Sequence, residues 1–223
     1  MGYNIAIDGP AGAGKSTIAK MVAKELGFIY VDTGAMYRGL AVHFLKKGIV
    51  PGEVEKIEAA CEDAKVELGY ENGVQQVYLN GENITSQLRE EAVGNMASVS
   101  SANPEVRAHL LKLQRNLAAE NNVVMDGRDI GTTILPNAEV KIFLTASAKT
   151  RASRRYLELT EKGEACDMDE ILKDIVDRDE RDMNRAVSPL KKAEDAVLVD
   201  SSEMGIDEVV ESILSVYRKR VNG

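Results

Sequence analysis

A glycine-rich stretch near the start of the sequence constrains this chain more than any other feature. Residues 3–17 read YNIAIDGPAGAGKST, in which Gly9, Gly14, Lys15 and Ser16 match the Walker A pattern G-x-x-x-x-G-K-[ST]. Glycines let backbone N–H groups turn inward around phosphates, where side chains would block the approach. Lysine supplies a positive charge, serine offers a hydroxyl to Mg²⁺, and the N-terminus of the following helix favours an anion. The stretch predicts a phosphate-binding loop.

The residues on either side of this loop agree with that prediction. An apolar run, Ile5 to Ile7, precedes the loop, and Ile18, Val22 and Leu26 follow it at helical spacing. A strand before the loop and a helix after it are the context that the pattern requires. The alternative is a glycine-rich turn that binds no nucleotide.

Length and composition limit the class of protein. The chain has 223 residues, of which 44% are hydrophobic, and a formal charge of −8. It is long enough for one α/β domain with appendages, or for two small domains. The negative charge speaks against a general nucleic-acid or membrane surface. Cys61 and Cys166 are isolated, so neither a disulfide framework nor a cysteine-rich zinc site is indicated. With no signal peptide or membrane-spanning run, we expect a cytoplasmic protein.

Hydrophobic periodicity predicts strands that alternate with helices. Short apolar runs predict five strands, at about residues 5–7, 28–31, 123–125, 140–144 and 197–199. Helical spacing and capping residues predict helices at about residues 14–26, 33–47, 53–63, 87–101, 103–119, 147–162, 169–186 and 206–220. This alternation indicates an α/β fold of the P-loop NTPase kind, with a doubly wound, five-stranded parallel sheet.

Residues 64–85 have a different pattern. Hydrophobic residues alternate over 66–70 and again over 77–79, and the tight-turn sequence Asn72-Gly73 lies between them. Asn80-Gly81 predicts a second turn, towards residues 83–85. We therefore expect a small antiparallel three-stranded insert that is separate from the main sheet.

Asp126 is a candidate metal ligand. It ends an apolar strand in VVMDGRD, the kind of position from which a Walker B carboxylate reaches Mg²⁺, often through water. An aspartate before glycine is also ordinary turn chemistry. The Walker A match favours the metal role.

Arginines are the other candidates for phosphate binding. Arg178, Arg181 and Arg185 lie three and four residues apart, which predicts a single helical face with three guanidinium groups. A second set is formed by Arg151, Arg154 and Arg155. So many arginines in an acidic chain suggest bidentate phosphate clamps. Interleaved acidic residues leave open a solvated helix held by salt bridges.

Other catalytic classes receive little support. His43 and His109 are typical of helix-surface or packing residues. The sequence suggests no Ser-His-Asp or Cys-His pair and has no HRD or DFG pattern, so neither a hydrolase triad nor a protein kinase is indicated.

Four motifs together resemble the bacterial cytidylate kinases, in the same order and spacing. They are GPAGAGKST, DTGAMYR, DGRDIGT and RDERDMNRAVSPL. The resemblance covers essentially the whole chain and includes the antiparallel insert. Thr33 stands where some members have serine, which keeps the hydroxyl. The resemblance implies a monomeric enzyme that uses Mg²⁺ and transfers the γ-phosphoryl group of ATP to CMP or dCMP, without nucleic-acid or membrane partners.

The resemblance also implies a role for each matching residue. Residues expected to bind ATP are Gly9, Pro10, Ala11, Gly12, Ala13, Gly14, Lys15, Ser16, Thr17 and Arg151. Residues expected to bind CMP are Thr33, Arg38, Ser98, Arg107, Arg128, Asp129, Arg178, Asp182 and Arg185. The catalytic cations are expected to be Lys15, Arg128, Arg155 and Arg185, and the metal ligands Ser16 and Asp126, the latter through water.

A single kinase domain with three regions is implied. We expect a core over residues 1–32, 104–150 and 187–223, a monophosphate-binding region over 33–103, and a short lid over 154–167. Arg151 is expected to stack on adenine, and Arg155 to close over phosphate as part of the lid.

The expected chemistry needs charge rather than a base. The phosphate of a nucleoside monophosphate is already largely ionised near neutral pH, so no general base is required. Cations must draw two anionic substrates into line. Cytosine offers an amine that suits an acceptor such as Asp129, and a ring nitrogen and carbonyl that suit donors such as Arg107 and Ser98.

Two other kinds of protein remain alternatives at this point. Another small-molecule P-loop kinase, acting on a different nucleotide or on shikimate, shares the phosphate loop. A GTPase-like switch or a nucleotide-regulated binding module is the alternative from a different class. The sequence lacks the guanine signature [NT]-K-x-D, which counts against the switch.

Overall fold

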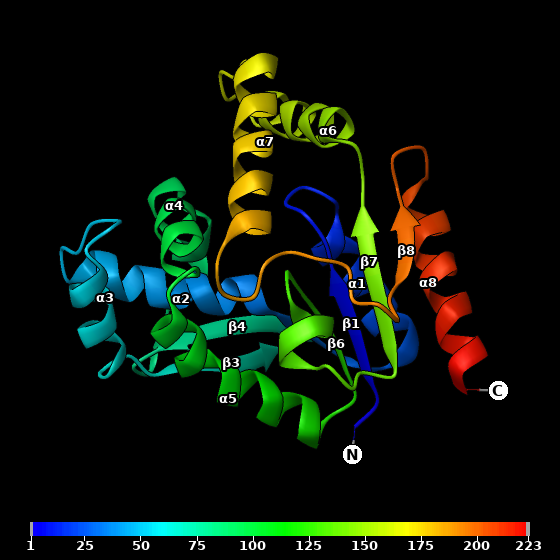
Figure 1. The fold of residues 1–223 in the computed structure, drawn as a ribbon, viewed down its shortest axis with the longest axis horizontal. Helices are drawn as coiled ribbons and strands as arrows, with labels where there is room; N and C mark the ends of the chain where they lie inside the picture. The colour runs from blue at the N-terminus through cyan, green and yellow to red at the C-terminus, as the bar shows by residue number, and fades with distance from the viewer. Residues whose placement is uncertain (1, 222–223) are drawn as a thin grey trace. The chain divides into compact units, whose positions relative to one another are not determined.

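The computed structural model describes residues 2–221 and divides into two compact units (Figure 1). Unit 1 is the uninterrupted stretch Val31–Glu120, and unit 2 consists of Gly2–Tyr30 and the chain from Asn121 onward. The three regions of the kinase domain stay a prediction; of the predicted core, residues 31–32 and 104–120 cluster with unit 1.

Unit 2 contains most of a five-stranded sheet, in the order β2-β6-β1-β7-β8. The doubly wound α/β arrangement predicted from the sequence is confirmed, and β2 spans the division between the units. The elements are β1 (Asn4–Asp8), α1 (Lys15–Leu26), β2 (Ile29–Asp32), β6 (Val123–Gly127), a π-helical turn η2 (Ile130–Ile134), β7 (Val140–Thr145), α6 (Ala148–Glu161), α7 (Met168–Asn184), β8 (Val197–Asp200) and α8 (Ile206–Val221).

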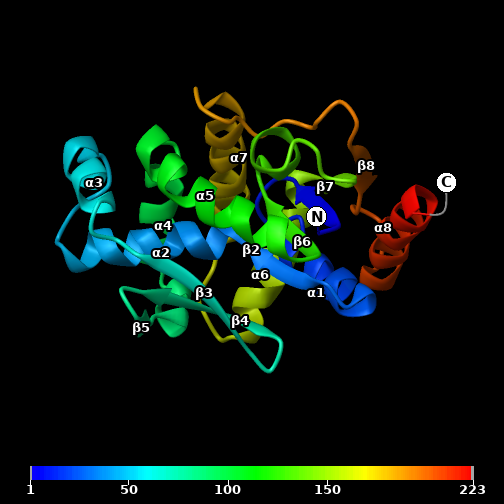
Figure 2. The same cartoon turned by 90° about the horizontal axis from the view of Figure 1, so that it is seen from below.

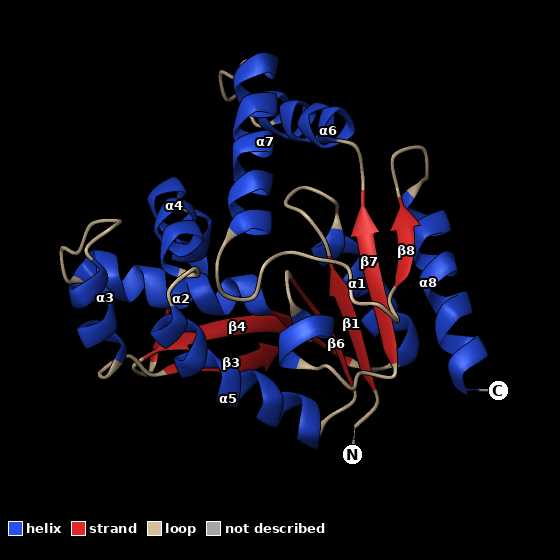
Figure 3. Cartoon of the chain, viewed as in Figure 1, coloured by secondary structure: helices blue, strands red, loops and turns tan. Residues whose placement is uncertain are grey.

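Parallel pairing brings the carboxyl ends of the strands to one edge of the sheet. β1 pairs in parallel with β6 and β7, and β7 with β8. The arrows of β1, β7 and β8 run in the same direction in Figure 3. Asp8, the last residue of β1, lies opposite Gly127 of β6 and Phe143 of β7. Ligands of open α/β sheets bind at this edge, so residues near Asp8 are candidates for the site.

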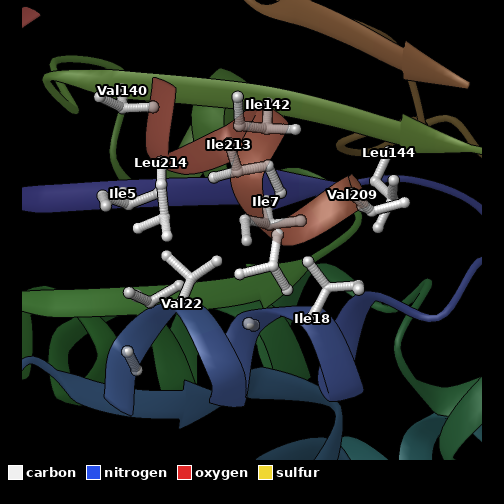
Figure 4. Packing of buried hydrophobic residues seen from close by; sticks show 14 of the residues in the cluster. Ile5, Ile7, Ile18, Val22, Val140, Ile142, Leu144, Val209, Ile213 and Leu214 are labelled. Atoms are coloured by element: carbon white, nitrogen blue, oxygen red, sulfur yellow. The ribbon is translucent and has the colours of Figure 1, made fainter. Parts of the chain in front are cut away.

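The hydrophobic core of unit 2 lies where α1 and α8 pack on the sheet (Figure 4). In α1 the helical spacing buries Ile18 and Val22, as predicted, and Leu26 is partly buried against them. In α8 most of the predicted apolar side is buried, but Ile206 at its first position is exposed. The core residues labelled in the figure are Ile5, Ile7, Ile18, Val22, Val140, Ile142, Leu144, Val209, Ile213 and Leu214.

Unit 1 contains helices and a separate antiparallel sheet in the order β3-β4-β5. Figure 2 shows β3 and β4 beside α2. Asn72 and Asn80 have positive φ angles, of 53° and 50°, at the two predicted turns, so the three-stranded insert is confirmed. The elements are α2 (Thr33–Lys46), α3 (Val54–Cys61), β3 (Val66–Glu71), β4 (Val74–Leu79), β5 (Glu82–Asn83), the 3₁₀ turn η1 (Thr85–Arg89), α4 (Glu91–Ser100) and α5 (Pro104–Glu120).

Local features of the structure bear on several predictions from the sequence. Asp32 caps α2 by accepting from the N–H of Ala35 at 3.0 Å. Both cysteines are free. His43 is buried, and its Nε2 lies 3.0 Å from Asp63 Oδ1, as is typical of a packing residue. Among residues 2–221, no helix is both long enough and apolar enough to cross a bilayer.

Candidate functional site

The phosphate loop joins β1 to α1 in unit 2. Gly9 has a φ of 152°, and a Cβ at this position would lie 1.9 Å from the carbonyl oxygen of Leu144, so only glycine fits. Gly14, the N-cap of α1, is left-handed with a φ of 81° and has no side chain with which to cap the helix. The first N–H groups of α1 are therefore left for an anion, which is the role that the sequence predicts for this loop.

Lys15 is buried at the start of α1. Its Nζ donates to the carbonyl oxygen of Pro10 at 2.7 Å. Burial, together with the positive charge of Arg128, lowers the pKa of Lys15 well below its usual range, although Asp126 and Asp8 oppose this. A phosphate oxygen is the kind of partner that holds such an ammonium group in its charged form.

Asp126 lies beside the phosphate loop in β6. Its Oδ2 accepts from the Ser16 hydroxyl at 3.0 Å, and its Oδ1 accepts from the Tyr30 hydroxyl at 2.9 Å. A hydroxyl and a carboxylate oxygen are the hard ligands that Mg²⁺ prefers. Within residues 2–221, no group of three or more His, Cys, Asp or Glu side chains could hold a metal by itself. The chemistry of the Ser16 hydroxyl and the Asp126 carboxylate fits a Mg²⁺ ion.

A second cluster lies where η2 follows β6 and where α7 ends. Arg128 Nε donates to Asp182 Oδ2 at 2.8 Å, and Arg185 Nη2 lies 3.6 Å from Asp129 Oδ1. Burial raises the pKa of Asp182, but the charges of Arg128, Arg178 and Arg185 together hold it below its usual range. Five residues predicted to bind CMP are thus electrostatically linked within unit 2.

The predicted single helical face with three arginines is wrong in two respects. The helix ends at Asn184, and Arg185 is its extended C-cap, with φ −63° and ψ 142°. Its Nε donates to the carbonyl oxygen of Ser188 at 2.6 Å. The exposed side chain of Arg181 bonds to the backbone of its own helix. Of these three arginines, only Arg178 and Arg185 therefore join Arg128 in the cluster.

The second arginine set separates into three different environments. Arg151 is buried, and its guanidinium donates to the carbonyl oxygens of Ala146 and Ala11 at 2.9 and 3.0 Å and to both oxygens of Asp179. Arg154 donates to Ser201, whereas Arg155 is exposed and pairs with Glu158 on its own helix α6. Arg151 thus connects the phosphate loop, α6 and α7, and its stacking on adenine stays a prediction.

Unit 1 brings together several of the remaining candidates. Thr33 opens α2, with Arg38 in the same helix. Arg107 of α5 is buried, lies over the Tyr37 ring at 5.5 Å, and donates to the carbonyl oxygen of Ser101 at 3.2 Å. The Ser101 hydroxyl in turn bonds to the carbonyl oxygen of Ser98. Arg107 and Ser98, the expected donors to cytosine, therefore belong to one local network.

Three residues of unit 2 were missed from the sequence. Asp8 binds the backbone of η2, Tyr30 orients Asp126, and Asp179 holds Arg151. The available signal for Asp8 was its place at a strand end directly before the phosphate loop. Tyr30 and Asp179 carry no comparable signal, because their partners are distant in sequence.

A phosphate loop after the central strand β1, with the carboxylate of β6 beside it, places this chain among the P-loop nucleotide-binding proteins. The family model described as "Cytidylate kinase" matches residues 5–219. This chain belongs to the cytidylate kinase family.

Curated relatives agree with that assignment. The cytidylate kinase of Caldicellulosiruptor saccharolyticus is 49% identical over 216 residues, which cover 97% of this chain and 96% of the relative. That of Thermotoga petrophila is 44% identical over 223 residues and covers 100% of both chains. Among solved structures, an uncharacterised protein from Eubacterium ventriosum has a TM-score of 0.54 and 13% identity, over 96% of each chain, which is a likeness of fold.

Proposed function

We propose that the protein transfers the γ-phosphoryl group of ATP to CMP or dCMP, giving ADP and CDP or dCDP. The observation that carries this proposal is the cluster of Arg128, Asp129, Asp182 and Arg185, held in the same unit as the phosphate loop. Guanidinium groups suit a phosphate, and a carboxylate suits the exocyclic amine of cytosine. The family of the chain and the names of its relatives support the same reaction.

On the donor side, the chain binds the triphosphate. Backbone N–H groups of the loop over residues 9–17, except at Pro10, which has none, surround the phosphates. Lys15 pairs with an outer phosphate, and Arg151 borders the loop at Ala11. Ser16 and Asp126 hold Mg²⁺, Asp126 through water. When bound, the ion neutralises charge on the phosphates between which the bond breaks.

On the acceptor side, the proposed residues are grouped by the part of CMP that each would bind. Arg38, Arg128 and Arg185 bind the acceptor or transferring phosphate, and Arg178 and Asp182 bind the sugar. Asp129, Arg107 and Ser98 recognise cytosine, and Thr33 offers its hydroxyl to the monophosphate. These roles rest on the motif resemblance together with the local contacts described above.

The transfer itself requires alignment and charge. The acceptor phosphate is already ionised, so its oxygen attacks the γ-phosphorus without a general base. Lys15, Arg128 and Arg185 offset the repulsion between the two anions and stabilise charge on the transferring group. The exposed Arg155 is proposed to add a further cation from the segment over residues 154–167. We also propose that the enzyme acts as a cytoplasmic monomer.

A panel of acceptors tests the proposed function. ADP release is measured with CMP, dCMP, UMP, AMP, GMP and shikimate, and CMP or dCMP should give the highest kcat/KM. Slow hydrolysis of ATP that no acceptor stimulates would contradict the proposal. Lys15→Ala, prepared in parallel, controls for a contaminating kinase.

Asp129→Ala then tests recognition of the base. Cytosine presents an amine where uracil presents a carbonyl oxygen, so loss of the carboxylate should lower kcat/KM steeply for CMP and little for UMP. Sites built on such polar pairing discriminate by about 10⁴ or more. Equal losses for the two acceptors would remove Asp129 from base selection.

A further inference from the structure

The turn η2 is capped from another strand. The first N–H groups of a helical turn have no acceptor within the turn itself. Here the carboxylate of Asp8, at the end of β1, accepts from two of them. Its Oδ1 binds the N–H of Ile130 and its Oδ2 the N–H of Gly131, each at 2.7 Å. Both carboxylate oxygens of a residue distant in sequence are thus used to fix the start of η2.

Asp129 occupies the position from which a side chain usually caps such a turn. Within the described turn, its side chain makes no capping hydrogen bond. Its Oδ1 is instead directed to Arg185, at 3.6 Å. The Asp129 side chain is therefore not the cap of this turn, and Asp8 performs that task.

The contact between Asp8 and η2 is tightly packed. The Asp8 residue is 4% exposed, and a Cβ added to Gly131 would lie 3.3 Å from its Oδ2 and 3.2 Å from Lys141 Cδ. A carboxylate this buried needs hydrogen bonds to offset its lost hydration. The two backbone N–H groups supply them, so the turn has little freedom to shift.

We propose that Asp8 is a positioning residue for the acceptor, an inference that rests on the proposed function. By capping η2 from β1, it leaves the Asp129 carboxylate to Arg185 and to the base. Asp8 also lies directly before Gly9 of the phosphate loop. Its hydrogen bonds therefore join that loop to the segment that follows Arg128 and Asp129. The donor loop and the base-selecting carboxylate are thereby held in one fixed arrangement within unit 2.

Asp8→Asn is the first test. The amide keeps one acceptor oxygen but presents its NH₂ group to the other backbone N–H, donor against donor. The start of η2 then lacks an acceptor, which Asp129 can supply only by turning away from Arg185. The ratio of kcat/KM for CMP to that for UMP should fall by about tenfold or more. Affinity for ATP, measured by calorimetry, should change less than this ratio, because Asp8 binds the backbone of η2 directly and affects Lys15 only through its charge.

Two further variants separate positioning from stability. Ile213→Ala removes a fully buried core side chain from α8 and lowers stability without touching η2. It should leave the CMP to UMP ratio unchanged. In an Asp129→Ala background, Asp8→Asn should lower the ratio no further, because Asp8 acts through Asp129. An equal loss for CMP and UMP, or an additive effect in the double variant, would overturn the proposal.

Hydrogen exchange decides the capping role even if Asp8→Asn does not fold. The amides of Ile130 and Gly131 should keep their protection in Asp129→Ala, since their acceptor is Asp8. A loss of protection of about tenfold or more would identify Asp129 as the cap and overturn the inference. If the wild type shows no preference for CMP over UMP, the proposed function fails instead, and the exchange result still decides between the two caps.

Discussion

Removal of Asp179 should destabilise unit 2 strongly, because it leaves a buried guanidinium without its carboxylate. The side chains of Arg151 and Asp179 are 5% and 13% exposed. Arg151 Nη1 donates to Asp179 Oδ1 at 3.1 Å, and Arg151 Nη2 donates to Asp179 Oδ2 at 2.5 Å. Loss of one partner from a buried pair costs about 3–5 kcal/mol. In Asp179→Ala, Arg151 keeps the carbonyl oxygens of Ala146 and Ala11. We therefore expect the lower end of this range, about 3 kcal/mol.

Urea denaturation of four proteins measures this effect. The wild type, Asp179→Ala, Arg151→Met and the double variant form a cycle whose coupling energy should be about 2 kcal/mol. Glu158→Ala is the matched control, because Glu158 pairs with Arg155 on the same helix but both side chains are 49% exposed. That variant should lose less than about 1 kcal/mol.

Both the stability and the ATP affinity can refute this reasoning. A loss below about 1 kcal/mol for Asp179→Ala would mean that the pair behaves like a surface pair. Because Arg151 also binds Ala11 in the phosphate loop, Asp179→Ala should weaken ATP binding more than Glu158→Ala does. Equal ATP affinities in the two variants would show that Arg151 does not support the loop through Asp179.

Three further predictions concern the phosphate loop and its neighbours. Lys15→Ala should lower turnover by about a hundredfold or more and change the melting temperature little. A loss of activity within about tenfold, or about 1.4 kcal/mol of barrier, would show that Lys15 does not act in the transfer step. Tyr30→Phe removes one hydrogen-bond donor to Asp126. Calorimetry should therefore find weaker ATP binding in the presence of Mg²⁺ and nearly unchanged ATP binding in its absence. An equal change in ATP affinity under the two conditions would contradict the metal role of Asp126. Burial raises the pKa of Asp8 from 3.8 to about 6. Because the folded state then binds the proton more tightly than the unfolded state, this group stabilises the fold at low pH and loses that effect as pH rises through 6. Relative to Asp8→Asn, the wild type should therefore gain roughly 1.3 kcal/mol in urea unfolding between pH 7 and pH 5, and a constant difference would contradict the shift.

Much of the fold could be predicted because its signals are local. Asp32 caps α2 and Ser147 caps α6 through contacts three residues away, and Asn72 and Asn80 adopt the positive φ that their turns require. The apolar runs that became β6 and β7 are recognisable without knowledge of their neighbours. The phosphate loop was equally recognisable, since its glycines and lysine act within one segment.

The parts that were missed depend on contacts between distant segments. The π-helical turn η2 is fixed by Asp8, which lies more than a hundred positions earlier in the sequence, so no local pattern predicts this turn. Arg154 carries the same charge as Arg151, yet one binds Ser201 and the other Asp179. Spacing alone cannot distinguish these partners. The end of α7 before Arg185 is a different case, because the contact of Arg185 with the carbonyl oxygen of Ser188 is only three residues away, yet the helical spacing of the arginines does not reveal it.

Unit 2 is built from two separate stretches of the chain, and this affects how it can fold during synthesis on the ribosome. β1 emerges first, but its two neighbours in the sheet, β6 and β7, are translated only after the whole of Val31–Glu120. The backbone of Asn4 can pair in register only after its partner Val123 has been synthesised. Unit 1, by contrast, is complete as soon as its own stretch has left the exit tunnel. We therefore expect the nascent chain to order unit 1 early, while both edges of β1 stay unpaired and in need of protection from other chains.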